Sequence, residues 1–521
     1  MNGYARLVHA EWTKFRTVRG WVIGMLVATA AIVGFGLFPG MEGTCGKRGT
    51  GSECVVPVGP EGQEVTDAFT FVHRPLTGDG TITARIASMT GFRPNFADGA
   101  HGDIEGVVPW AKAGLIVKDG TRSGSTYAAV MLTGGHGVRL QHNYVHDRAG
   151  STAAATAPRW LRLTRGGDRI TALESADGVS WTGIGTVRLT DLPATAEVGL
   201  FVTSPQFTET IGAASASGGP SKATAGFDQI STTGGWPEGT WAVATGGPVE
   251  GPGSPGGPGS PDIGGPAGNR GPAGDGRPNG AEETAGGFTV TGSGDIGPAV
   301  AGAAGLGTTI SQTLIGTFAG LVFVVVIGAM TMTGEYRRGL IRTSLTAAPR
   351  RLTALAAKAT VLGGVAFVAG LAAAAVVVGF GPDIMRGNGI YVHPASTMTE
   401  LRVVVGTGAL LALAAVLALA FGVLLRRGTT AVTLAIVATV LPYLLSMTVL
   451  PIAAGEWLLR VTPAAAFAIQ QSTPRYAQVD GVYTPANGFF PLAPWAGFAV
   501  LLAWAGVGLA FAAYRFRRRD V

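Results

Sequence analysis

The residues best suited to chemistry in this sequence are cationic rather than catalytic, and they gather in the stretch 333–351, TGEYRRGLIRTSLTAAPRR. This stretch lies between two uncharged apolar runs. Arginines at this density bind acidic partners, or hold a loop on the cytoplasmic side of a membrane. The candidate site residues are Glu335, Tyr336, Arg337, Arg338, Arg342, Arg350 and Arg351.

A short helix over 335–345 is expected to present these arginines. Glu335 lies near its start, where a negative charge suits the positive end of the helix dipole. Pro349 then breaks the helix before the next apolar run. The simpler alternative is that the arginines only fix the topology of the chain, because basic loops flank membrane spans on the cytoplasmic side.

Motifs for nucleotide hydrolysis are missing from the sequence. A P-loop needs G-x-x-x-x-G-K-[ST], in which backbone amides and a lysine hold the phosphates. The one Gly-Lys pair, Gly46-Lys47, is followed by Arg48. We therefore expect no catalytic residues and no cofactor in this chain.

Two further groups of polar residues point only weakly to chemistry. The metal candidates are His136, His142, His146 and Asp147, but side chains on a β-hairpin need not converge on one ion. Asp103 and Glu105 are not sufficient to predict a glycosidase site, because such a site requires two carboxylates facing one bond. No metal site is therefore predicted.

Aromatic side chains in the same region allow a second kind of binding. Trp110, Tyr144 or Trp181 could stack on sugar rings if they were exposed. More often such residues belong to the core.

Composition indicates a chain partly solvated by lipid, because only 13% of its 521 residues are charged and 47% are hydrophobic. The basic residues behind the net charge of +6 lie beside apolar runs, so the topology of a membrane protein explains them better than binding to nucleic acid does. Cys45 and Cys54 are the two cysteines. If their segment is extracellular, a disulfide between them is expected.

Six apolar runs are each close to the length that a helix needs to cross a bilayer. Lys and Arg are concentrated in alternate connections, which places both termini in the cytoplasm and the long segment after the first span outside. The sequence thus predicts a multi-pass α-helical protein of the plasma membrane with six transmembrane helices. The predicted spans are 21–38, 313–332, 361–380, 403–425, 429–450 and 495–514.

The first span has a competing interpretation. A basic segment precedes it, and Ala28-Thr29-Ala30 resembles a signal-peptide cleavage site. This site lies inside the apolar run, so we favour an uncleaved signal anchor. Residues 1–20 before it predict an amphipathic helix on the membrane surface, in which Trp12 and Phe15 contact lipid. An ordinary basic flank of the span is the alternative.

Residues 39–235 alternate with period two, with glycine-containing turns between the runs, and predict an all-β sandwich. The segments 113–120 (AGLIVKDG), 127–132, 174–181 (ESADGVSW), 198–201 and Phe227-Asp228 resemble a concanavalin-like or laminin-G-like jelly roll. This sandwich would be exoplasmic, between the first two spans. A Gly/Pro-rich linker and membrane-proximal segment, 236–305, follows it, and 288–291 could form one more strand.

None of the six runs contains Asp, Glu, Lys, Arg or His. Ion-driven carriers usually bury such groups, so this absence favours energy delivered from outside the membrane. Gly316 and Gly320 form a G-x-x-x-G pattern that favours close helix packing, and a dimer interface is one way to use it.

The N-terminal stretch LVHAEWTKFRTVRGW, the basic loop GEYRRGLIRT with APRR, and six spans ending in an arginine cluster resemble type-2 ABC exporter permeases. The resemblance covers 1–38 and 306–521. It implies a transport subunit that couples through its second loop to a separate ATPase carrying the ATP, and that pairs with a second permease copy. Residues 462–470 resemble the short exoplasmic or re-entrant helix of that family.

A different function is also compatible with the sequence. The chain could be a cell-surface receptor or sensor whose sandwich binds a glycan and whose helices serve as an anchor. Six spans exceed what an anchor needs, so the permease ranks first.

Overall fold

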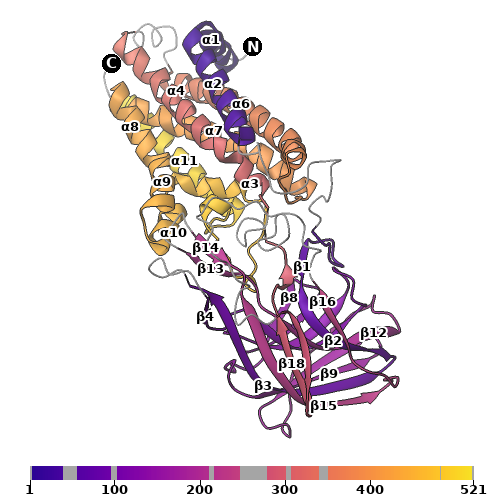
Figure 1. Cartoon of the computed structure of the whole chain (residues 1–521). Helices are drawn as coiled ribbons and strands as arrows, with labels where there is room; N and C mark the ends of the chain where they lie inside the picture. Colours follow the sequence, from indigo (N-terminus) through magenta and orange to yellow (C-terminus); the bar gives the residue numbers. More distant parts are fainter. Residues whose placement is uncertain are drawn as a thin grey trace.

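The computed structural model describes residues 3–38, 56–95, 103–210, 216–246, 278–300, 307–339, 350–481 and 483–518. A helical bundle and a β-sandwich are stacked end to end, and both chain termini lie at the end of the bundle away from the sandwich (Figure 1). The cysteines Cys45 and Cys54 fall outside the described residues, and so does the expected disulfide.

The helical part confirms a multi-pass arrangement of apolar helices. Within the described ranges, five helices are long and apolar enough to cross a membrane, or up to seven if two bent pairs each count as a span. The uninterrupted helices are α2 (Arg19–Leu37), α3 to α4 (Ile310–Arg337, with α3 Ile310–Thr313, η3 Leu314–Gly316 and α4 Thr317–Arg337), α6 (Arg351–Gly387), α7 (Thr397–Leu425) and α11 (Pro494–Arg518).

Two segments depart from straight helices. The run expected to be one span, 429–450, is α8 (Gly428–Thr439) and α9 (Leu441–Thr448), which meet at 43°. Pro442 lies at this break, where its missing N–H and its ring interrupt the helical hydrogen bonds. α10 (Ile452–Val461) meets η4 (Pro463–Gln470) at 96°, and every residue of η4 is buried. A short turn, η5 (Pro485–Asn487), precedes α11.

The sandwich consists of two antiparallel sheets whose facing side chains form one apolar core. One sheet has the order β11-β10-β9-β3-β15-β18-β17, with β4 paired to β3. Its strands are β3 (Gly80–Pro94), β4 (Asp103–Glu105), β9 (Arg159–Gly166), β10 (Arg169–Ser175), β11 (Thr182–Arg188), β15 (Lys222–Gly234), β17 (Gly280–Thr284) and β18 (Gly287–Gly292).

The other sheet has the order β16-β2-β12-β5-β6-β7-β8. Its strands are β2 (Phe69–Thr77), β5 (Lys112–Lys118), β6 (Tyr127–Thr133), β7 (Val138–His142), β8 (His146–Ala149), β12 (Thr195–Thr203) and β16 (Ala242–Gly246). A separate ribbon pairs β1 (Val65–Asp67) with β19 (Ile296–Pro298), and a small hairpin pairs β13 (Phe207–Thr210) with β14 (Ala216–Gly219).

The sandwich reaches further along the chain than the sequence suggested. β18 pairs with β15 from Ala223↔Gly292 to Asp228↔Gly287, and β17 pairs with β18. Residues 236–305, expected as linker and membrane-proximal segment, therefore include strands β16 to β19. β18 contains the strand expected at 288–291. The Gly/Pro-rich sequence around the other three strands hid their signal, because the alternation in each of them is only a few residues long.

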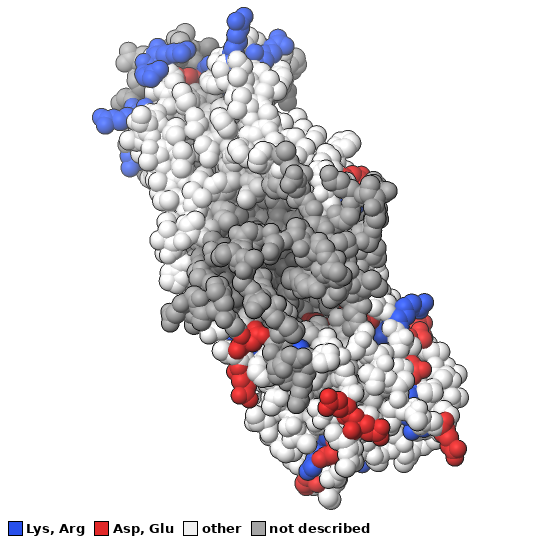
Figure 2. Space-filling view, viewed as in Figure 1, with Lys and Arg blue, Asp and Glu red and all other residues white. Residues whose placement is uncertain are grey.

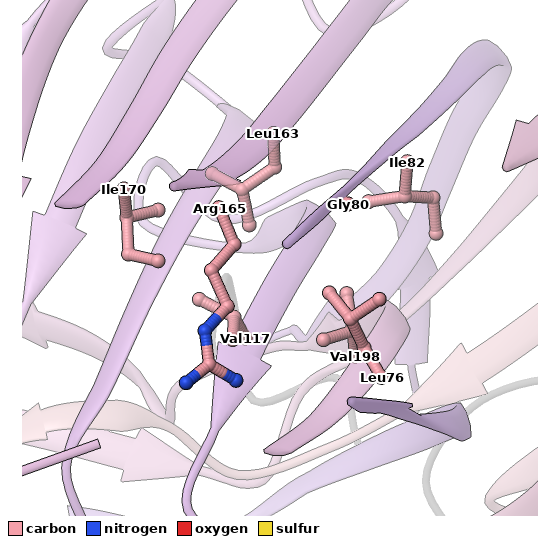
Figure 3. Close-up of a pocket in the computed structure, with 8 residues that line it drawn as sticks. All are labelled: Leu76, Gly80, Ile82, Val117, Leu163, Arg165, Ile170 and Val198. Atoms are coloured by element: carbon pink, nitrogen blue, oxygen red, sulfur yellow. The ribbon is translucent and has the colours of Figure 1, made fainter. Parts of the chain in front are cut away.

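One cavity inside the sandwich is too small for a ligand. That cavity holds about 10 Å³ and is lined by Leu76, Gly80, Ile82, Val117, Leu163, Arg165, Ile170 and Val198. Figure 3 shows these side chains from facing strands, with Arg165 as the polar member. The Arg165 guanidinium donates to the carbonyls of Pro193 (2.5 Å) and Ala194 (3.2 Å), so it is satisfied by a loop.

Candidate functional site

Three helices meet in a network of partly buried ion pairs at the bundle end that carries both termini. Lys358 on α6 contacts Glu335 on α4 at 2.6 Å and Glu11 on α1 (Gly3–Thr17) at 2.8 Å. Lys14, also on α1, makes a second ion pair with Glu335. We call these four residues the ion network.

The centre of the ion network is shielded from solvent. Glu335 is 3% exposed. The pKa of Lys14 is lowered to about 8, chiefly by burial and then by the positive charge of Lys358, while Glu11 acts to raise it. Buried charges are costly when a partner is removed, so the network makes the positions of α1, α4 and α6 depend on one another.

The structure corrects the role expected for Glu335. It was predicted in the first turn of a new helix, 335–345, but it lies in the last turn of α4, which continues to Arg337. No proline or turn motif interrupts TMTGEYR, and the carboxylate faces into the bundle toward two lysines. Residues 340–349, which include Arg342, lie outside the described part of the chain.

Several arginines surround the ion network at this end of the bundle. Arg337, Arg338 and Arg350 are exposed, whereas Arg351 donates to the carbonyl of Phe516 on α11 at 3.2 Å. Figure 2 shows Lys and Arg gathered at this end, which we call the basic end, and Asp and Glu scattered over the sandwich. The arrangement can dock an acidic surface beside the ion network.

Tyr336 is half-buried next to these arginines. The guanidinium of Arg426, which follows α7, lies 5.0 Å from the centre of its ring. This cation–π contact connects the last turn of α4 with the connection between α7 and α8.

Trp12 and Phe15, predicted to face lipid together, have different surroundings. Trp12 is 44% exposed, but Phe15 is 5% exposed and belongs to the core of the bundle. A cavity of about 20 Å³ lies beside Phe15, Trp21 and Lys358. α1 therefore packs against α6, and the Tyr4 hydroxyl is 2.8 Å from that of Thr360.

The G-x-x-x-G pattern is used inside the chain. A Cβ at Gly316 would lie 2.4 Å from the carbonyl oxygen of Ile32 on α2, and one at Gly320 would lie 2.5 Å from the Ile32 side chain. These glycines let α2 approach α4 closely, and the first predicted span is packed as a helix of the bundle.

The aromatic residues considered for sugar stacking are not free platforms. Trp110 is 2% exposed, and Tyr144 is fully buried. The guanidinium of Arg162 lies 3.8 Å from the centre of the Trp181 ring and covers it. Trp110 and Tyr144 are therefore interior side chains, and Trp181 is partly buried with one face of its ring covered.

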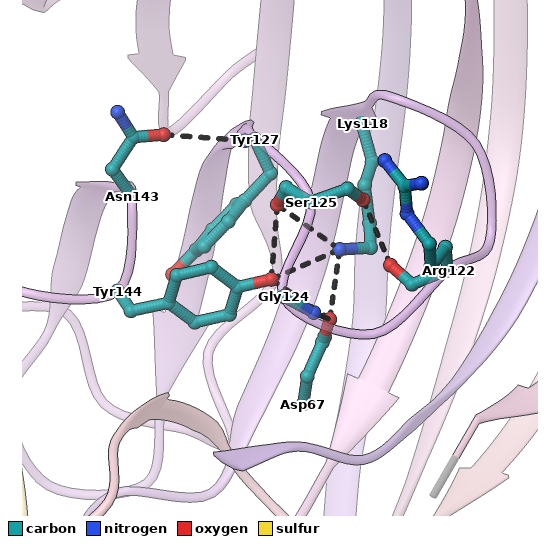
Figure 4. Close-up of polar contacts among 8 residues, drawn as sticks. All are labelled: Asp67, Lys118, Arg122, Gly124, Ser125, Tyr127, Asn143 and Tyr144. Atoms are coloured by element: carbon teal, nitrogen blue, oxygen red, sulfur yellow. Dashed lines mark hydrogen bonds and ion pairs between the residues drawn. The ribbon is translucent and has the colours of Figure 1, made fainter. Parts of the chain in front are cut away.

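Tyr144 belongs instead to a buried polar cluster (Figure 4). Its hydroxyl donates to the Asp67 carboxylate at 2.8 Å, and the Lys118 ammonium contacts the same carboxylate at 2.8 Å. The amide of Gly124 donates to Asp67 as well. The cluster ties β1 to β5.

The histidines do not assemble a metal site. In the part of the chain that the structure describes, no three His, Cys, Asp or Glu side chains could hold one ion. His142 stacks on His146 with ring centres 4.4 Å apart, and His136 stacks on Trp110. The pKa of His142 is lowered to about 4, chiefly by burial and then by the neighbouring His146.

Sequence reasoning missed the pairing of Glu11, Lys14 and Lys358 with Glu335. In the sequence, Lys14 and Lys358 are only two of the positive charges near predicted spans. A signal was present, because Glu11 and Lys14 are three residues apart on one helical face and Lys358 directly precedes an apolar run.

Comparison with known proteins decides the family. The family model described as ABC-2 family transporter protein matches residues 148–521, which is most of the chain. The chain belongs to the ABC-2 transporter family. This membership supports a membrane permease component of an ABC transporter, and it implies an ABC ATPase subunit as partner of this ABC-2 protein. No curated protein matches it.

Solved structures resemble parts of the ABC-2 protein only distantly. A functionally unknown protein from Saccharomyces cerevisiae is 15% identical, with 36% of this chain and 84% of that chain covered and a TM-score of 0.21. The GH43 protein BlXynB from Bacillus licheniformis is 14% identical, with 24% of each chain covered and a TM-score of 0.17. Scytalido-glutamic peptidase is 11% identical, with 35% and 88% covered and a TM-score of 0.20. Similarities this low carry no functional argument.

Proposed function

We propose that this chain is the permease subunit of an ATP-driven exporter, and that a separate cytoplasmic ATPase acts on it at the basic end. The observation that carries the proposal is the ion network, in which Glu335 joins α4 to both α1 and α6. The basic end is then cytoplasmic, and the sandwich is extracellular.

The ion network provides a physical route for coupling. α4 and α6 flank the segment 340–349, so a partner that binds there applies force to the ends of both helices. Because Lys358 contacts Glu335 and Glu11, a shift of α4 is passed to α6 and α1 together. Packed elements with shared ion pairs move between discrete arrangements rather than bend continuously.

Arg337, the last residue of α4, and Arg338, its C-cap, fit the docking role, because both side chains are exposed at the end of this helix. A second permease copy would complete the path across the membrane, as in the family resemblance. The lipid bilayer contacts the exposed apolar side chains of α2 and α11, among them Ile23, Leu26, Trp504 and Val507.

Charge reversal of the two exposed arginines tests this proposal. The variant Arg337→Glu with Arg338→Glu should lower stimulation of the ATPase by about tenfold, because like charges then face the acidic docking surface. Its amount in the membrane should equal that of the wild type.

Arg169→Glu is the control, because Arg169 is an exposed arginine on the sandwich. Its stimulation should match the wild type. Unchanged stimulation in the Arg337→Glu, Arg338→Glu variant would show that the arginines only fix topology.

A further inference from the structure

The chain enters and leaves the sandwich through one two-stranded stalk. β1 on the incoming side pairs with β19 on the outgoing side, from Val65↔Pro298 to Asp67↔Ile296. The amide of Ala299 donates to the carbonyl of Glu64 at 3.0 Å, which extends the pairing by one step. In Figure 1, β1 lies at the end of the sandwich nearest the helices.

Buried ion pairs fix both strands of this stalk to the same strand of the sandwich. Asp67 on β1 contacts Lys118 at one end of β5, and Asp295, next to β19, contacts Lys112 at the other end at 2.5 Å. Lys112 is fully buried, and Lys118 is 1% exposed. The stalk and the sandwich therefore move as one body.

The stalk in turn holds the loop between α6 and α7. The Glu64 carboxylate accepts a hydrogen bond from the Tyr391 hydroxyl and pairs with Nδ1 of His393. Backbone bonds join the same loop to the segment that leads into α3, because the Thr308 amide donates to the carbonyl of Tyr391 at 2.9 Å and the His393 amide donates to the carbonyl of Thr308 at 3.0 Å. Val392 is 1% exposed between them.

A second contact joins the sandwich to the segment between η4 and α11. The Gln478 side chain donates to the carbonyl of Val145 at 2.9 Å. Val479 and Phe489 pack with Val300, which follows the stalk. Both contacts lie at helix connections facing the sandwich, so the sandwich covers this end of the bundle.

These connections are firmly attached to the helices. The Gln470 amide at the end of η4 donates to the hydroxyls of Thr317 on α4 and Thr407 on α7, at 3.0 Å each, and all three side chains are buried. Arg402 on α7 donates to the carbonyl of Gln471. A movement of α4 against α7 must therefore disturb the connections to which the sandwich is bound.

We propose that Glu64 is a latch that holds the sandwich as a lid over the sandwich-facing ends of α6 and α7, and that this closed arrangement restrains the transport cycle. The inference rests on the proposed function, because the restraint is read out through the ATPase. Coupling is reciprocal, so opening the lid and rearranging the helices favour one another.

The test uses the full chain with its co-purifying ATPase in lipid nanodiscs. Glu64→Gln removes the charge, and Tyr391→Phe removes one donor while keeping the ring. Glu61→Gln is the matched control, because Glu61 belongs to the same incoming segment but pairs with the half-exposed His146. Hydrogen–deuterium exchange is followed at the amides of Thr308 and His393, together with the basal ATPase rate.

Both latch variants should increase exchange at these two amides by about tenfold, the effect of losing one charge-assisted hydrogen bond. Exchange in β6 should stay as in the wild type, which shows that the sandwich is folded. The basal ATPase rate should rise in both variants and not in Glu61→Gln.

Unchanged exchange at Thr308 and His393 would overturn the latch. Increased exchange with an unchanged ATPase rate would overturn the restraint on transport. A wild-type chain that does not alter ATPase activity at all would instead contradict the proposed function, and with it the restraint. The two failures are thus distinguished by the behaviour of the wild type.

Discussion

Lys358 is the residue on which the ion network depends, because its ammonium group contacts both Glu11 and Glu335. Lys14 contributes less to the ion network. Burial and the charge of Lys358 lower its pKa and thus disfavour its protonated form in the folded state. The two lysines share Glu335 but have unequal importance for stability.

This inequality can be measured with matched substitutions. Lys358→Met leaves two carboxylates without their common partner and should lower the free energy of unfolding by about 3 kcal/mol. Lys14→Met leaves Glu335 paired with Lys358 and should change it by less than about 1 kcal/mol. Thermal unfolding of the purified full chain in one detergent measures both. Equal losses of unfolding free energy in the two variants would contradict the greater importance of Lys358.

At the scale of elements, α2 and α4 approach so closely that glycine is required between them. A Cβ at Gly316 would lie 2.4 Å from the backbone carbonyl oxygen of Ile32, whereas one at Gly320 would meet the Ile32 side chain at 2.5 Å and a backbone atom, the carbonyl oxygen of Ala28, only at 3.3 Å. A backbone atom cannot rotate away as a side chain can. Gly364 on α6 has no neighbouring atom within 4 Å.

A series of Gly→Ala variants follows from this difference. Gly316→Ala should destabilise the chain by about 2–3 kcal/mol through overpacking, and Gly320→Ala by less. Gly364→Ala should be neutral or stabilising by up to about 1 kcal/mol, because alanine favours a helix. The melting temperatures of the three variants give the order. A loss of melting temperature in Gly364→Ala as large as in Gly316→Ala would contradict the close packing of α2 against α4.

The success of sequence reasoning depended on how local the signal was. The segment 198–201 falls within β12, and Gly78, with a φ of +73°, provides one of the expected glycine-containing turns, between β2 and β3. Alternation and turn glycines are properties of a few neighbouring residues, so the sequence can report them. The contact of Lys14 with Glu335 joins positions 321 residues apart, which no periodicity reports.

Other differences came from competing local rules. Glu335 is expected near a helix start because a negative charge suits the positive end of the helix dipole, yet α4 continues past it with the carboxylate turned inward. β18 contains the strand expected at 288–291, whereas β17 was concealed by the glycines around it. The buried donor Gln470 was expected only as part of a short helix, and its two threonine partners come from distant helices.

In the whole molecule, the ion network and the sandwich lie at opposite ends of the same helices. The ion network joins α1, α4 and α6 at the basic end, and the sandwich is bound to the connections at the other end. α4 and α6 extend between these regions (Figure 1), so in the proposed function they link the ATPase at one end to the lid at the other. The family membership makes such long-range coupling the central expectation.

The most direct test of that expectation is to purify the chain from its native membrane in mild detergent and measure ATP hydrolysis by whatever ATPase accompanies it. The account predicts that an ABC ATPase co-purifies, and that its rate in lipid nanodiscs changes several-fold when the wild-type chain is added but not with the Arg337→Glu, Arg338→Glu variant. An ATPase whose rate is the same with and without the chain, or a chain that purifies with no ATPase, would contradict it.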